Sequence, residues 1–202
     1  MLDCLDESAL SPADIDRLFL QARTHSAWLD TPVPAGLLKT LFQMTVMGPT
    51  AANCLPMRLC FVQSPQAKAR LLPLMAAGNV EKTRTAPVSA ILAYDLTFYR
   101  HLNQLFPHEP DAPSWFTGAP QATRDAALRN ASLQGGYFIM AARALGLDAG
   151  PMGGFDADGV AQAFFPGQPY EVNFICNLGY ADHSALYPRL PRLSFEQACS
   201  IV

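Results

Sequence analysis

The segment 132–142 constrains the fold more than any other part of the chain, because it carries no charged residue and lies inside a long predicted helix. The helical pattern extends from about Gln121 to Leu145, and Gly146 is expected to end it. A helix with so little charge has to be covered on most sides, so we expect it at the centre of the fold. The pair Gly135-Gly136 within it indicates close approach of another backbone or of a ligand.

The whole chain is poor in charge, which limits the classes of protein to which it can belong. Hydrophobic residues make up 50% of its 202 residues and charged residues 15%, so a disordered chain is excluded. With 14 Lys and Arg against 17 Asp and Glu, the net charge of -3 leaves no basic excess for binding nucleic acid. The length predicts a single domain over residues 1–202, with either a large core or a surface buried against a second subunit.

Neither the first residues nor the cysteines indicate export. The acidic N-terminus has no apolar signal region, and the longest apolar stretches are too short to span a membrane. The five cysteines are scattered and form no CxxC pair, which argues against a disulfide framework and a zinc site. We therefore expect a cytoplasmic protein with no metal and no membrane partner.

Strand and helix patterns mix along the chain without regular alternation. Strands are predicted at 58–62, 87–94 and 171–178, and helices at 34–47, 65–76 and 156–164, besides a short helix beginning near Pro12. Three strands, with a fourth left open, predict an α+β fold rather than a doubly wound parallel sheet. Met44 and Met47 are expected in the core. The Pro-rich excursion 103–120, with Trp115 and Phe116, is expected to be a surface loop that either walls a pocket or packs on its neighbours.

Two basic segments are candidates for an anion site. Arg23, Thr24, His25 and Ser26 follow one another near the N-terminus, and Arg189 and Arg192 lie on a Pro-stiffened segment near the C-terminus. Arginines combined with small hydroxyl donors are the groups that bind a phosphate monoester. The residues alone leave a phosphate site and two solvated surface patches equally open.

Three further segments have the composition of turns that approach a ligand. They contain Pro49, Thr50 and Asn53; Asn79 and Lys82; and Pro151, Gly153 and Gly154. Small residues and glycines let backbone N–H groups come close to a ligand, although each segment also fits an ordinary connection.

These segments, in this order, resemble the FMN-dependent nitroreductase family from about Leu18 to Ala198. The resemblance rests on ARTHS, GPTAANCLP, AGN, GLDAGPMGGF, and a Gly-Tyr pair followed by arginines. Within the family the chain is most similar to malonic semialdehyde reductases of the pyrimidine-utilisation pathway. The resemblance implies an intertwined homodimer with a mainly antiparallel sheet packed by helices. The N-terminal and C-terminal segments would be its arms, and two FMN sites would lie at the interface.

The resemblance also implies roles for the candidate residues. The phosphate motif contains Arg23, Thr24, His25 and Ser26 and is completed by Arg189 and Arg192. The ring and ribityl chain would lie along Pro49, Thr50 and Asn53. The pyrimidine edge would be approached by Asn79 and Lys82, and flavin N5 by Pro151, Gly153 and Gly154. The chain departs from the family pattern at Ser26, where a second cation is usual, and at Leu55, Met57 and Gly153. These departures bear on the substrate range.

The activity that the resemblance implies is ping-pong hydride transfer from NADH or NADPH to a small acceptor. The acceptor would be an aldehyde such as malonic semialdehyde, a nitroarene or a quinone. The catalytic proton donor stays open, since His25, His108 and Tyr99 qualify by residue type alone. Two alternatives are a flavin-storage protein without reductase activity, and a hydrolase with Cys54 as nucleophile, for which spacing identifies no base.

Overall fold

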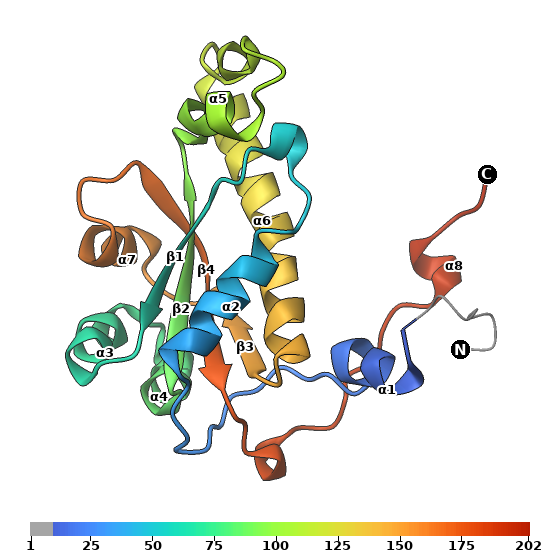
Figure 1. Ribbon diagram of the computed structural model, residues 1–202. Coiled ribbons are helices and arrows are strands. Elements are labelled where there is room, and N and C mark those ends of the chain that lie inside the picture. The colour runs from blue at the N-terminus through green and yellow to red at the C-terminus, as the bar shows by residue number, and fades with distance from the viewer. Residues whose placement is uncertain (1–9) are drawn as a thin grey trace.

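The structure is a computed structural model that describes residues 10–202 (Figure 1). The acidic first residues and Cys4 lie outside the described part. The strands are β1 (Met57–Val62), β2 (Val88–Asp95), β3 (Asp148–Met152) and β4 (Tyr170–Gly179). The helices are α1 (Pro12–Ile15), α2 (Ala35–Thr45), α3 (Pro65–Leu71), α4 (Ala77–Thr85), α5 (Leu102–Leu105), α6 (Pro120–Ala144), α7 (Ala157–Phe164) and α8 (Phe195–Ala198).

The four strands form one antiparallel sheet in the order β1-β2-β4-β3. This confirms the predicted α+β class and the mainly antiparallel sheet. Every residue of β2 is buried, because the strand has a neighbour on each side and helices over both faces. β1 and β3 are the two edges of the sheet.

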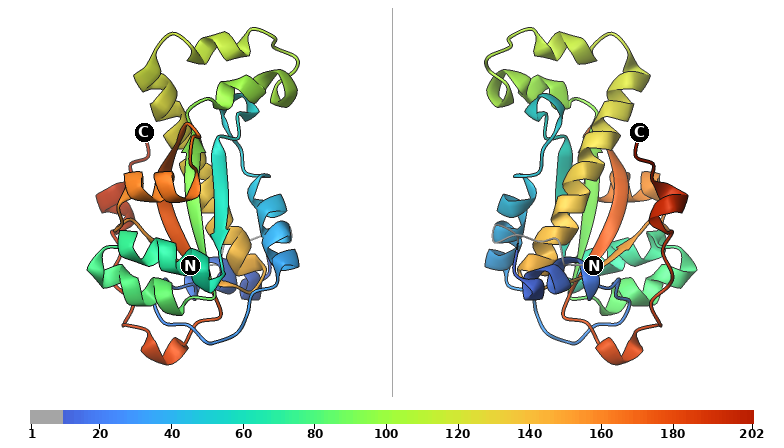
Figure 2. Two further views of the ribbon diagram at one scale, coloured as in Figure 1. Left: turned by 90° about the vertical axis from the view of Figure 1, so that its left-hand side faces the viewer. Right: turned by 90° about the vertical axis from the view of Figure 1, so that its right-hand side faces the viewer.

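Helices cover both faces of the sheet, as the two views of Figure 2 show. Along β2, Val88, Ala90 and Leu92 belong to a core shared with α2 and α6. Ile91 belongs to a second core, which contains residues of α3 and α7. The period of two along a strand therefore divides one buried strand between two cores.

The charge-poor helix α6 is central, but its uncharged middle is only partly covered within the chain. Phe138 is fully buried, whereas Leu133 and Tyr137 are 50% and 46% exposed. A Cβ built on Gly135 would lie 2.7 Å from the Phe174 ring, and nothing lies within 4 Å of one built on Gly136. The close approach expected at the glycine pair is thus to a side chain, and only at Gly135.

The strand β3 and the helix α4 were not predicted. β3 contains Gly150 and Pro151, which are poor strand formers, and it exists because it pairs with β4. A proline is tolerated in an edge strand because its missing N–H costs no ladder bond on the open side. The helix α4 begins at Ala77, so Gly78 and Asn79 lie in its first turn and not in a separate turn.

Other local expectations were wrong in part. The predicted helix 65–76 ends at Leu71 and continues as a single tight turn, 72–74. The excursion 103–120 contains short helical turns, in which Phe116 packs edge-on against Phe98 with ring centroids 4.9 Å apart. Met44 and Met47 are 37% and 74% exposed and not in the core, because the face of α2 that contacts the core is formed by Leu38 and Leu41.

The contact at Gly135 gives a test of how tightly α6 packs on the sheet. We expect Gly135→Ala to lower the free energy of unfolding by about 1–3 kcal/mol, because the new methyl group overlaps the Phe174 ring. Gly36→Ala in α2 is the control, since nothing lies within 4 Å of its built Cβ. Urea denaturation of both variants checks this, and equal stabilities would contradict the packing described.

Candidate functional site

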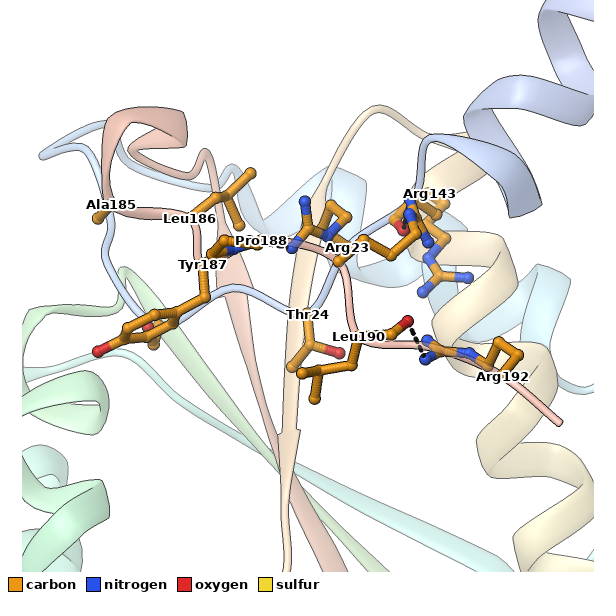
Figure 3. Close-up of a pocket in the computed structure, with 12 residues that line it drawn as sticks. Arg23, Thr24, Arg143, Ala185, Leu186, Tyr187, Pro188, Leu190 and Arg192 are labelled. Carbon is orange, nitrogen blue, oxygen red and sulfur yellow. Dashed lines mark hydrogen bonds between the residues drawn. The ribbon is translucent and has the colours of Figure 1, made fainter.

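A polar cavity of about 280 Å³ lies between the N-terminal segment 22–26, the end of α6 and the C-terminal arm. Five of the predicted phosphate residues line it, namely Arg23, Thr24, Ser26, Arg189 and Arg192. Figure 3 shows side chains reaching this cavity from all three segments. The structure thus brings together two basic motifs that lie more than 160 residues apart in the sequence.

Arg143 also lines this cavity, although sequence reasoning did not select it. It is half-buried near the end of α6, where burial lowers the pKa of its guanidinium. One of its nitrogens donates to the Leu18 carbonyl at 2.9 Å. Arg143 lies beside Thr24 only because segments distant in the sequence come together in the fold. The one sequence signal that could have pointed to Arg143 is that it is the last cation before Arg189.

Arg189 of the C-terminal arm and Arg23 of the N-terminal segment tie these two segments together. Arg189 donates to the carbonyls of Leu20 and Ala22 at 2.7 and 3.1 Å, and Arg23 donates to the carbonyl of Tyr187. These contacts use part of each guanidinium and hold the cations around one cavity. An arginine has five N–H donors, so further donors remain for an anion.

His25 has a different place from its neighbours. Because side chains alternate along an extended segment, Thr24 and Ser26 line the arginine cavity, and the His25 side chain lies on the other side. It is buried, with Nε2 3.2 Å from Oδ1 of Asp148. Burial raises the pKa of Asp148, but hydrogen bonds from His25 and the Ala181 N–H outweigh it and lower the pKa. The His25 side chain is thus held by Asp148 outside the arginine cavity, and its cofactor role stays a prediction.

The edge strand β3 joins the arginine cavity to a second cluster of candidates. Thr24 forms a bridge with Ala149, and the His25 N–H donates to the Ala149 carbonyl at 3.1 Å. From Ala149 the chain runs through Pro151 to Gly153, about 13 Å at the usual rise of a strand. The edge therefore leads from the cations directly to the Gly153-Gly154 turn.

At that turn, α4 meets the end of β3. Asn79 donates from Nδ2 to the Gly154 carbonyl at 2.9 Å and accepts from Lys82 Nζ at 3.2 Å. Gly153 is exposed, and nothing lies within 4 Å of a Cβ built on it. Among residues 10–202, none accepts a hydrogen bond from the backbone N–H of Gly153 or Gly154. The turn is open at Gly153 and has two free donors beside an ammonium group.

The segment with Pro49, Thr50 and Asn53 lies near the other end of α6, next to α5 (Figure 1). Asn130 on α6 accepts from the Ala51 N–H at 2.8 Å, and Asn53 donates to the Leu105 carbonyl at 2.8 Å. Thirteen residues separate Asn130 from Arg143, about 20 Å along a helix. Within one chain, this segment and the arginine cavity are therefore far apart.

This segment also stores backbone strain. Ala52, Asn53 and Leu55 have φ angles of 50°, 48° and 37°, in the left-handed region that non-glycine residues rarely adopt. Each costs on the order of 1–3 kcal/mol, and such residues cluster at sites that bind ligands. Met57 donates its N–H to Gln134 on α6 at 3.0 Å, which helps to hold the strained conformation.

The remaining reactive groups do not form a catalytic cluster. Cys54 is 1% exposed, and burial raises the pKa of its thiol to about 11. The His108 ring packs on Phe106 with centroids 4.0 Å apart, and Tyr99 packs on Phe98. In the described part of the chain, no group of three His, Cys, Asp or Glu residues could hold a metal ion. None of the helices within 10–202 has the length and apolar character to cross a membrane.

Known structures share this fold. A nitroreductase from Bacillus subtilis, provisionally named, matches with a TM-score of 0.86 and 23% identity, covering 94% of this chain and 99% of its own. A provisionally named nitroreductase from Exiguobacterium sibiricum, solved in complex with FMN, matches with a TM-score of 0.84 and 20% identity, covering 98% and 100%.

Sequence comparisons agree with the likeness in fold. A protein from Ralstonia nicotianae with the provisional name NADH dehydrogenase/NAD(P)H nitroreductase is 57% identical over 193 residues, 96% of this chain and 98% of its own. The model of the nitroreductase family matches residues 20–180. The chain therefore belongs to the nitroreductase family.

Proposed function

We propose that this protein is an FMN-dependent oxidoreductase that takes hydride from NADH or NADPH. The observation that carries the proposal is the arginine cavity joined by the open edge of β3 to the Asn79–Lys82 cluster. Membership of the nitroreductase family supports the proposal. A relative provisionally named NAD(P)H nitroreductase and a fold neighbour solved in complex with FMN support it as well.

The residues present fit FMN. A phosphate needs several cations and small donors, and the cavity has both in Arg23, Arg143, Thr24 and Ser26. An anion there would offset the unfavourable burial of Arg143. A flat ring needs an uncrowded surface, and Gly153 provides one.

Each part of the site has a distinct task in this proposal. When bound, FMN supplies two-electron transfer between a nicotinamide and an acceptor. The arginines and hydroxyls bind and orient it through its phosphate. The Gly153 and Gly154 N–H groups would hold its ring, and the Lys82 ammonium would stabilise negative charge at its pyrimidine edge. Asn79 orients Lys82 through the hydrogen bond between them.

The site is completed by a second copy of the chain in our proposal. The strained segment 50–55 is too far from the arginine cavity to reach the same ligand within one chain. Apolar side chains stand exposed on α2, just after it and on α6, where Phe42, Met47, Leu133 and Tyr137 are between 45% and 74% exposed. A built Cβ on Gly48 lies 2.7 Å from the Tyr137 ring, so the end of α2 and the middle of α6 form one surface. An apolar surface of this kind is typical of a homodimer interface.

The C-terminal arm fits the same assembly. It extends away from the sheet beyond α1 (Figure 1), and Leu190, Leu193 and Phe195 on it are exposed. Apolar residues on an arm without a core of its own need a partner surface to bury them. The two terminal arms of the intertwined dimer are thus part of the proposal.

For the acceptor we propose a small aldehyde, with malonic semialdehyde giving 3-hydroxypropionate as the specific candidate, and nitroarenes or quinones as further substrates. The support is the resemblance of ARTHSAW, GPTAANCLP and RLPRLSFEQA to that subgroup. Trp115 is 57% exposed in the excursion that packs beside segment 50–55, where it could wall a pocket shared by two chains.

The two alternatives make different predictions about chemistry. A hydrolase would need a Cys54 thiolate, which a pKa of about 11 and burial make scarce at neutral pH. A flavin-storage protein would bind FMN without passing electrons onward.

The function is tested with the purified holoprotein under argon. We expect NADH or NADPH to bleach the flavin absorbance, and malonic semialdehyde, a quinone or a nitroarene to restore it. Cys54→Ala should keep this activity. Bound FMN that no nicotinamide reduces would favour the storage role, and a preparation that takes up no FMN would refute the proposal.

Arg143 gives a test of the phosphate site. We expect Arg143→Met to weaken FMN binding to the apoprotein by about 10- to 100-fold, since a hydrogen bond to a charged group contributes about 1.5–3 kcal/mol. Quenching of FMN fluorescence measures the Kd. The control is Arg70→Met, which removes an exposed arginine on α3 outside the cavity. An unchanged Kd for Arg143→Met would remove this residue from the site.

The assembly is tested by placing a charge on the exposed face of α6. Wild-type protein should elute in size-exclusion chromatography with light scattering at twice the chain mass of 21.9 kDa. Leu133→Glu should elute as a monomer and lose FMN, while Leu29→Glu, an equally exposed apolar position elsewhere, should remain dimeric. A Leu133→Glu variant that stays dimeric and keeps its flavin would contradict the proposed interface.

A further inference from the structure

Lys68 on α3 is buried on the face of the sheet opposite α6. It is 8% exposed, and Nζ donates to the Thr83 carbonyl at 2.6 Å and to the Ser89 hydroxyl at 2.8 Å. Burial lowers its pKa to about 8, so the group is mainly charged at neutral pH. No carboxylate in the described residues forms an ion pair with it. An unpaired buried ammonium is costly, which points to a specific task.

The two carbonyls at the end of α4 lack their ordinary helical donors. Thr83 would accept from the residue four positions on, but this is Pro87, which has no N–H. The Lys82 carbonyl would accept from the Ala86 N–H, but this C-cap N–H forms no hydrogen bond within the described residues. The sequence thus ends α4 with unsatisfied acceptors next to the residue expected at the flavin edge.

A chain of three buried side chains supplies the missing donors. Lys68 donates to the Thr83 carbonyl, and Asn177 donates from Nδ2 to the Lys82 carbonyl at 3.0 Å. Ser89 links the two, since it accepts from Lys68 and donates to Oδ1 of Asn177 at 2.6 Å. Ser89 and Asn177 are directly opposite in the β2–β4 ladder, so the chain is anchored in the sheet.

The anchored turn carries the amide and ammonium of the candidate site. Lys82 Nζ reaches Asn79, which is bound to the Gly154 carbonyl. Thr83 also contacts Met152 of β3, with 3.7 Å from its hydroxyl oxygen to the sulfur. The position of the last turn of α4 therefore fixes where the Lys82 ammonium lies relative to the end of β3.

We propose that Lys68, acting through Ser89 and Asn177, is a positioning residue that holds the last turn of α4 so that Lys82 faces the flavin. The inference rests on the proposed function, because its test measures the midpoint potential of the bound flavin. Lys68 does not touch the ligand. It acts by binding the carbonyl of the residue after Lys82.

The test combines Lys68→Met with Lys82→Met and measures the midpoint potential of the bound flavin. We expect Lys68→Met to lower the potential by about 30 mV, which corresponds to about tenfold weaker binding of reduced relative to oxidised flavin. In the Lys82→Met background, the same substitution should have little effect, because the ammonium that it positions is gone. Lys39→Met, an exposed lysine on α2, is the matched control and should leave the potential unchanged.

Two further measurements separate positioning from general stability. Hydrogen exchange should become faster in residues 82–85 of Lys68→Met, and the Kd for FMN of its apoprotein should rise by about tenfold. If Lys68→Met does not fold, Ser89→Ala breaks the same chain and should shift the potential in the same direction.

The outcomes are distinct from those that test the function. A wild-type protein that holds no reducible flavin would refute the proposed function. A normal wild-type flavin with no shift in Lys68→Met, or with the same shift in both backgrounds, would overturn the role of Lys68.

Discussion

The outer edge of β3 is the constraint on which the candidate site depends. One side of this strand pairs with β4, and the other side is bridged by Thr24, which brings the N-terminal basic segment beside the sheet. The same strand ends at Gly153, where α4 meets it. Pro151 lacks an N–H and is suited to a strand whose outer side forms no continued ladder. A single short strand thus connects an anion site with a site for a flat ring.

The helix α6 contributes both to the core and to the candidate site. Its buried face packs on the sheet through residues such as Phe138, and its amides Asn130 and Gln134 hold the strained segment 50–55. Its last turn brings Arg143 to the arginine cavity. The uncharged middle leaves Leu133 and Tyr137 exposed, which a second copy would cover. The low charge of the chain therefore has two sources, the core and the exposed apolar surface that we propose a second copy covers.

Sequence patterns predicted those elements whose stability is mostly local. Pro65 follows the N-cap Ser64, and β1 and β2 are short, mostly apolar runs, so the start of α3 and both strands lie close to their expected positions. β3 was missed because Gly150 and Pro151 oppose strand formation and only pairing with β4 overrides them. The helix α4 was missed because Gly78 and Asn79 favour turns.

The sequence by itself determined the α+β class and the family, together with five of the residues around the arginine cavity, since these depend on residue types in a fixed order. The tertiary structure decided which residues share a site. It added Arg143, placed the His25 side chain away from the cavity because neighbours alternate in an extended segment, and showed Lys68 bound to the end of α4. The physical reason is that such contacts join segments distant in the chain, and their pairing depends on how the whole sheet is packed.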